Sequence, residues 1–64
     1  MIKTNERLQT DADFENAVLF KSRVAVLQYG MTVDYGGVIQ SLDAEYVKIN
    51  ERYYQKASYE FRVR

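Results

Sequence analysis

Hydrophobic and polar positions alternate along most of the chain, and this alternation predicts β-strands. In the segment 22–29, Val24 and Val26 fall on one side of an extended chain, and Ala25 and Leu27 fall on the other. Period-two spacing with many β-branched residues is typical of a strand. The same criteria predict four further strands, which span 32–42, 46–50, 52–56 and 59–63.

A double glycine and a tight turn lie in the middle of the strand-forming region. Gly36 and Gly37 fall inside the second predicted strand, where glycine marks either a bulge or a point of strong curvature. We favour curvature, because a short chain that forms a small barrel must bend its strands. Gly30 and Met31 are expected to form the turn before this strand, and Asp43 the turn after it.

Ahead of the first strand, the spacing of apolar residues changes to that of a helix. Recurrence at i, i+3 and i+4 predicts one amphipathic helix over about 11–20. Thr10 and Asp13 have the spacing of a capping box that would start this helix. Residues 1–7 are short and polar, and we expect them to form a flexible tail. The apolar residues at helical spacing are Phe14, Ala17 and Val18.

The order of elements predicts a mainly β fold with an N-terminal helix and five strongly bent antiparallel strands, as in an SH3-like small barrel. Residues 8–64 are expected to form a single domain. A domain of this size buries only about 60% of its unfolded surface, so its stability is marginal without reinforcement. The chain contains no cysteine and no histidine, which excludes disulfides and the common zinc sites. Association with further copies of the chain is the reinforcement that remains.

The charge and the residue types restrict the function. Nine basic and nine acidic residues give a net charge of zero, unlike a protein that holds nucleic acid by bulk electrostatics. Triads that need histidine or cysteine are impossible, and no carboxylate or lysine pair has a recognisable catalytic spacing. We therefore expect a non-enzymatic protein without cofactor or metal. No signal peptide or membrane span is visible, which favours a cytoplasmic location.

Several short motifs occur in the order found in one protein family. Leu8-Gln9 precedes the helix, which contains Phe14-Glu15-Asn16-Ala17. Arg23-Val24-Ala25-Val26 begins the first strand, and Gly37-Val38-Ile39-Gln40-Ser41-Leu42-Asp43 leads into the turn. In order and spacing, residues 8–64 resemble the Sm-like family and especially its bacterial branch, Hfq. Small Sm-like proteins of marine phage and metagenomic origin are similar in size and also differ from Hfq at the loops.

The resemblance implies a homo-oligomeric ring of five to seven subunits, in which the fifth strand of one subunit pairs with the fourth strand of the next. It also implies binding of single-stranded RNA, in which bases stack on aromatic side chains and basic side chains meet phosphates. Asp43, Tyr46 and Lys56 would lie at the pore, Tyr29 would stack adenine on the opposite face, and two basic residues would lie on the outer rim. The positions carried over from the family are Gln9, Lys21, Arg23, Tyr29, Asp43, Tyr46 and Lys56.

Each of these residues also has a purely structural interpretation. Asp43 is suited to capping its own turn, and Lys56 to standing in solvent. Tyr29 fits a half-buried strand position, and Tyr46 fits packing or a subunit contact. The chain also departs from the bacterial pattern, because Ala44-Glu45 replace Gln-Phe and the histidine of the second motif is missing. The resemblance implies an RNA chaperone or post-transcriptional regulator. The departures from the bacterial pattern favour the alternative, a structural or protein-interaction ring with little or no RNA binding.

Overall fold

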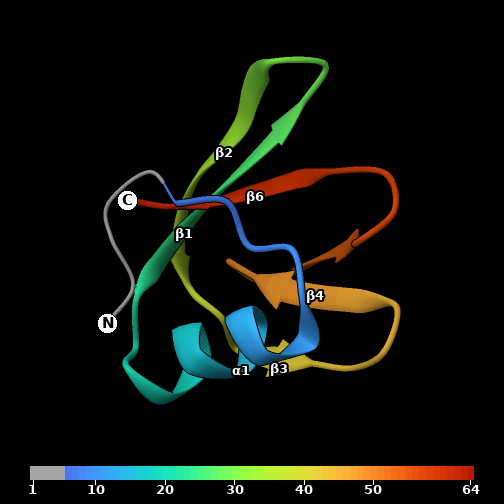
Figure 1. The fold of residues 1–64 in the computed structure, drawn as a ribbon. Coiled ribbons are helices and arrows are strands. Elements are labelled where there is room, and N and C mark those ends of the chain that lie inside the picture. The colour runs from blue at the N-terminus through green and yellow to red at the C-terminus, as the bar shows by residue number, and fades with distance from the viewer. Residues whose placement is uncertain (1–5) are drawn as a thin grey trace.

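A computed structural model describes residues 6–64, and the fold is mainly β with one N-terminal helix and antiparallel sheets (Figure 1). The helix matches the predicted position within one residue. In chain order the elements of this part of the chain are α1 (Asp11–Leu19), β1 (Arg23–Gln28), β2 (Met31–Val38), β3 (Ser41–Leu42), β4 (Tyr46–Ile49), β5 (Arg52–Gln55) and β6 (Glu60–Val63).

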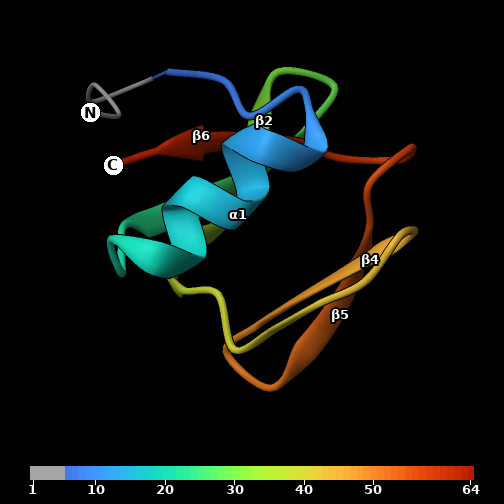
Figure 2. The same ribbon diagram turned by 60° about the horizontal axis from the view of Figure 1, so that its bottom comes forward.

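The strands form two three-stranded sheets, with the orders β2-β1-β6 and β3-β4-β5. All their pairings are antiparallel. In Figure 2, β4 and β5 form a layer that lies apart from β6, and α1 lies next to β6. The two sheets are not closed into one hydrogen-bonded barrel in residues 6–64.

The described part of the chain has six strands, so the expectation of five strands is wrong. The predicted strand 32–42 is divided into β2 and β3, because residues 39 and 40 leave the first sheet and enter the second. The preceding bend depends on Gly36, whose φ is +96°. A Cβ at Gly36 would lie 2.2 Å from the backbone oxygen of Val24, so only glycine fits. The register of β1 with β2 also shifts here, because Val24 pairs with Gly37 and Val26 with Asp34, so the glycine pair marks the β-bulge that was the alternative to curvature.

A polar cluster ties this bend to the second sheet. The Asp34 carboxylate accepts hydrogen bonds from the Gly36 N–H (2.8 Å), the Asn50 amide (2.9 Å) and the Tyr54 hydroxyl (2.8 Å). Burial opposes ionisation of Asp34, but the three donors outweigh it and hold its pKa below the ordinary value. The pKa of Tyr54 is raised, first by burial and then by its bond to Asp34. The cluster therefore fixes the direction of β2 as it leaves the first sheet.

The helix covers the core through one face and begins at the predicted cap. Thr10 and Asp13 form a reciprocal capping box, and the Gln9 and Thr10 N–H groups lower the pKa of Asp13. Phe14 meets Phe61 edge to face, with 5.3 Å between ring centroids. No helix within residues 6–64 is long and apolar enough to cross a membrane. The buried core consists of Leu8, Phe14, Ala17, Val24, Val26, Ile39, Val47, Ile49, Tyr54, Phe61 and Val63.

The segment before the helix lies along the outer edge of β6. The Leu8 N–H donates to the Phe61 carbonyl (2.9 Å), and the Val63 N–H donates to the Glu6 carbonyl (3.0 Å). Arg7 is thereby paired with Arg62 in an antiparallel bridge. Within the expected flexible tail of residues 1–7, Arg7 thus forms an isolated bridge with β6, and residues 1–5 lie outside the described residues.

Candidate nucleic-acid interface

Tyr29 stands at the tip of the β1–β2 hairpin in a conformation that tyrosine disfavours. Both turn residues have positive φ, 54° at Tyr29 and 78° at Gly30. Two-residue turns of this kind favour asparagine, aspartate or glycine at their first position. The turn is therefore at Tyr29 and Gly30, one residue earlier than predicted, and β1 ends at Gln28. Tyr29 is 95% exposed, so the half-buried strand position considered for it is wrong.

Further exposed apolar side chains follow Tyr29 along β2. Met31 is 72% exposed and Tyr35 is 73% exposed, with Val33 between them also on the surface. The Arg64 guanidinium lies 5.9 Å from the centroid of the Tyr35 ring and donates to the Tyr35 carbonyl at 2.6 Å. We call these five residues, Tyr29, Met31, Val33, Tyr35 and Arg64, the hairpin surface. The hairpin projects beyond the rest of the fold, at the end opposite α1 in Figure 1.

Asp43 organises the turn between β3 and β4. Its Oδ1 accepts hydrogen bonds from the Glu45 N–H (2.9 Å) and the Tyr46 N–H (2.8 Å), and its own N–H donates to the Tyr46 carbonyl. The two backbone donors, together with the charge of Lys56, lower the pKa of Asp43. The carboxylate therefore has the turn-capping role that was the structural interpretation of this residue.

Lys56 points toward the helix and makes intramolecular contacts there. Its Nζ lies 3.6 Å from Asp11 Oδ1 and 4.8 Å from the centroid of the Phe14 ring. Only 16% of the lysine side chain is exposed. The Lys56 N–H also donates to the Glu45 carbonyl at 2.8 Å, which ties the end of β5 to the Asp43 turn. A phosphate at this position would have to compete with Asp11 for the lysine.

The surroundings of Asp43 are acidic. A cavity of about 180 Å³ lies between the start of the helix and the turn, and three of its five lining residues are carboxylates. At neutral pH these groups repel phosphate, and Lys56 is the cation that the structure places beside them. This arrangement is poorly suited to RNA. The lining residues are Asp11, Glu15, Leu42, Asp43 and Ala44.

The other predicted contacts lie apart from the hairpin tip. Gln9 is exposed, and its backbone N–H belongs to the helix cap. Lys21 follows the helix with a φ of 53° and is exposed, as is Arg23 at the start of β1. Tyr46 is 40% exposed in β4 and pairs with Gln55. Asp43 and Lys56 come close together near the helix start, whereas Tyr29 belongs to the β1–β2 hairpin, which Figure 1 shows at the end opposite α1.

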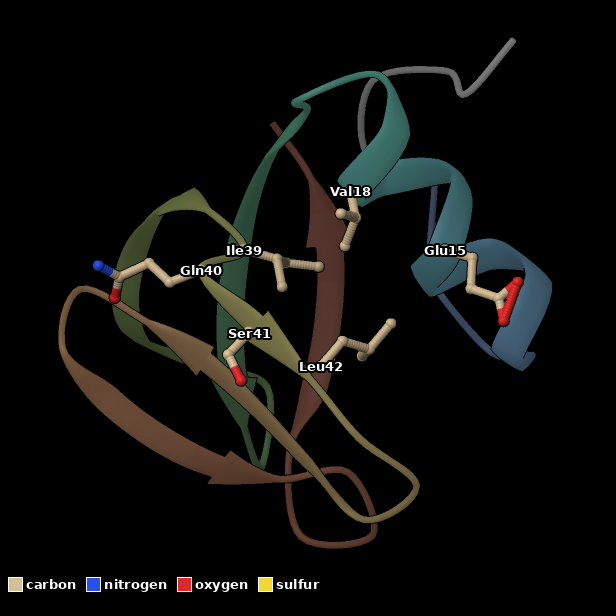
Figure 3. Close-up of a pocket in the computed structure, with 6 residues that line it drawn as sticks. All are labelled: Glu15, Val18, Ile39, Gln40, Ser41 and Leu42. Carbon is tan, nitrogen blue, oxygen red and sulfur yellow. The ribbon is translucent and has the colours of Figure 1, made fainter.

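A groove of about 360 Å³ separates α1 from the bent strand. Figure 3 shows Val18, Ile39 and Leu42 directed into it, while Gln40 points away. Glu15 and Ser41 complete its lining. The groove is an apolar cleft with a carboxylate at one side, and it offers no basic group that would recognise a phosphate.

The sequence does not reveal most of the hairpin surface. It predicts a turn at Met31 and a strand that includes Tyr35, and it indicates no role for Arg64. The available signal was Gly30, because glycine at the second position of a two-residue turn between alternating segments marks a hairpin, and the residue before it then lies at the tip. Comparisons with protein-family models, with curated protein sequences and with solved structures found no match.

Proposed function

We propose that the chain is a subunit of an Sm-like ring that binds single-stranded RNA. The order of an N-terminal helix and antiparallel strands supports this proposal, as does the strand bent at Gly36. When β2 and β3 are counted as one broken strand, the fourth and fifth strands of the family correspond to β5 and β6. Both end the strand order of their sheets, so a neighbouring copy could pair at the edge of β5, and at the edge of β6 once residues 6–8 leave it.

The observation that carries RNA binding is the placement of Tyr29. A turn tyrosine with positive φ costs the fold free energy, and such strain gathers at functional sites. Its ring is almost fully exposed, and Tyr35 provides a second exposed ring on the same hairpin. Stacking of a base on an aromatic side chain contributes about 1–3 kcal/mol, and every base has a face that can stack. Repetition of the hairpin around a ring would multiply one weak contact into useful affinity.

The hairpin surface suits RNA better than the turn at Asp43. Arg64 lies over the Tyr35 ring and supplies a cation near the stacking side chains. The Asp43 turn instead combines three carboxylates with a lysine already paired to Asp11. We therefore place the main RNA contact on the hairpin and assign no phosphate contact to Lys56.

Titration of fluorescent A-rich and U-rich single-stranded RNAs tests this function at two salt concentrations. We expect binding that weakens as salt rises, because phosphate contacts release counterions. Tyr29→Ala should weaken binding at least about fivefold, as the loss of one stacking contact predicts. Phe20→Ala removes another exposed aromatic, at the end of α1, and should leave affinity unchanged. Equal affinities for wild type and Tyr29→Ala would refute the hairpin site.

The alternative function is a structural or protein-interaction ring. The specific observation in its favour is the acidic cavity beside Asp43, which removes the pore as a place for phosphate. The net charge of zero points the same way. Absence of RNA binding at low salt, together with an intact ring by light scattering, would select this alternative.

A further inference from the structure

The outer edge of β6 is already occupied by the chain's own N-terminal segment. Residues 6–8 run along this edge and make two backbone hydrogen bonds to it, at Phe61 and Val63. We call this segment, Glu6–Leu8, the edge strap. It covers the edge at which the proposed ring would place β5 of a neighbouring copy.

The edge strap and a neighbouring strand cannot pair with β6 at the same time. A backbone N–H donates one good hydrogen bond, and the Val63 N–H is committed to the Glu6 carbonyl at 3.0 Å. A neighbouring strand that pairs along β6 needs the same donor. It also needs the space in which Arg7 lies opposite Arg62.

Leu8 anchors the edge strap at one end, and Arg7 meets a like charge on β6. The Leu8 side chain is buried in the core with 4% exposure, so the strap is fixed where it leads to the helix. Arg7 and Arg62 lie directly opposite each other, and like charges at opposite positions destabilise a strand pair. The ion pair between Arg62 and Glu60 reduces this repulsion. A neighbouring strand can therefore compete for the backbone groups of Phe61 and Val63, while the Leu8 side chain remains in the core.

We propose that the edge strap is an intramolecular competitor of ring assembly. This inference rests on the proposed ring. In the single chain, the strap satisfies the β6 edge and protects it from uncontrolled pairing. Assembly begins when β5 of a second copy displaces Glu6 and Arg7. β5 presents a four-residue strand, Arg52–Gln55, for the same edge, so mass action favours the exchange once copies are abundant. The strap thereby raises the protein concentration at which the ring forms.

A reversible disulfide between the edge strap and β6 tests this competition in the full-length chain. Arg7 and Arg62 are a pair flanked by the two backbone bonds, a geometry that brings opposite Cα atoms about 4.5 Å apart and suits a disulfide. The chain has no cysteine of its own, so the double variant Arg7→Cys, Arg62→Cys has a single possible intramolecular disulfide. Light scattering over a concentration series would compare its oxidised and reduced forms with wild type.

We expect the oxidised variant to stay monomeric at concentrations at least about tenfold above those at which the reduced form assembles. Equal assembly of both forms overturns the competition and leaves the ring intact. A monomer in both forms and in wild type overturns the ring itself. Failure of the two thiols to form an intramolecular disulfide contradicts the pairing of the strap with β6.

A second variant changes how strongly the edge strap pairs with β6 and needs no disulfide. Arg7→Glu places opposite charges at the strap pair and should raise the concentration needed for assembly about two- to fivefold. Arg7→Lys keeps the like charges and should assemble as wild type does. An unchanged or lower assembly concentration for Arg7→Glu contradicts the proposal.

Discussion

Tyr29 has a backbone conformation that a different side chain would occupy at lower cost. Its φ of 54° belongs to the left-handed region, which costs about 1–3 kcal/mol for a residue other than glycine, and less for asparagine. The exposed ring recovers none of this free energy by packing. This cost is consistent with the proposed role of Tyr29 in base stacking.

Replacement of Tyr29 by asparagine should separate stability from function. Tyr29→Asn should raise the free energy of unfolding by about 0.5–1 kcal/mol, because asparagine suits the first position of this turn. The same variant should bind A-rich RNA at least about fivefold more weakly than wild type. Urea unfolding and RNA titration on the same samples measure the two effects. A less stable variant would show that the tyrosine ring supports the fold.

Asp34 makes the stability of the fold depend on pH in the acid range. Its pKa is lower in the folded chain than the ordinary value of 3.8, so ionisation of this carboxyl favours folding. This stabilisation is fully present above about pH 4 and is lost as pH falls through the lower folded value. We expect Asp34→Asn to lower the free energy of unfolding by about 1–2 kcal/mol at pH 7. The stability of this variant should also depend less on acid pH than that of wild type.

Urea unfolding at a series of pH values between neutral and acid measures this effect. Tyr54→Phe keeps the buried ring and removes one of the three donors to Asp34, so its acid dependence should be intermediate. The interpretation fails if Asp34→Asn retains the full acid dependence of wild type.

At the scale of elements, local signals were sufficient for the helix and insufficient for the bent strand. The cap at Thr10 and the apolar spacing predicted the helix almost to the residue, because both act within a few positions of the chain. The alternation of apolar and polar residues predicts one strand over 32–42. It does not show which sheet contains the neighbouring strand. The division at residues 39 and 40 arises from the pairing of β3 with β4.

Substitution of Gly37 should destabilise the fold much less than substitution of Gly36. Gly36→Ala would place a Cβ 2.2 Å from a backbone oxygen in a left-handed conformation, and we expect a loss of about 3 kcal/mol or more. Gly37→Ala meets only the end of the Asn50 side chain at 2.9 Å, which can move, so its loss should be clearly smaller. Thermal or urea unfolding compares the two; equal losses would contradict the assigned role of Gly36.

At the scale of the candidate site, the sequence does not reveal the surroundings of the residues that the family resemblance suggests. The resemblance suggests base stacking by Tyr29, but period-two spacing places this residue in a strand because spacing does not reveal the sign of φ. Lys56 was assigned to phosphate because its partner Asp11 is distant in the sequence and no local pattern links them. The pairing of Arg7 with Arg62 was missed for the same reason.

At the scale of the whole molecule, small size and strand edges both favour association. A chain of 64 residues without cysteine has a limited core, and four strands of the described part, β2, β6, β3 and β5, lie at the ends of their sheets. Burial of the β5 and β6 edges between copies would add hydrogen bonds and apolar contact at once. In the proposed ring, the edge strap would set the concentration at which this exchange becomes favourable.

The most direct test of the proposed ring is its mass in solution, measured by size-exclusion chromatography with light scattering over a wide concentration series. We predict a mass that rises with concentration and stops at that of five to seven chains of 7.5 kDa each, because a ring closes. A mass that remains at 7.5 kDa throughout, or one that grows without reaching a limit, would contradict a closed ring.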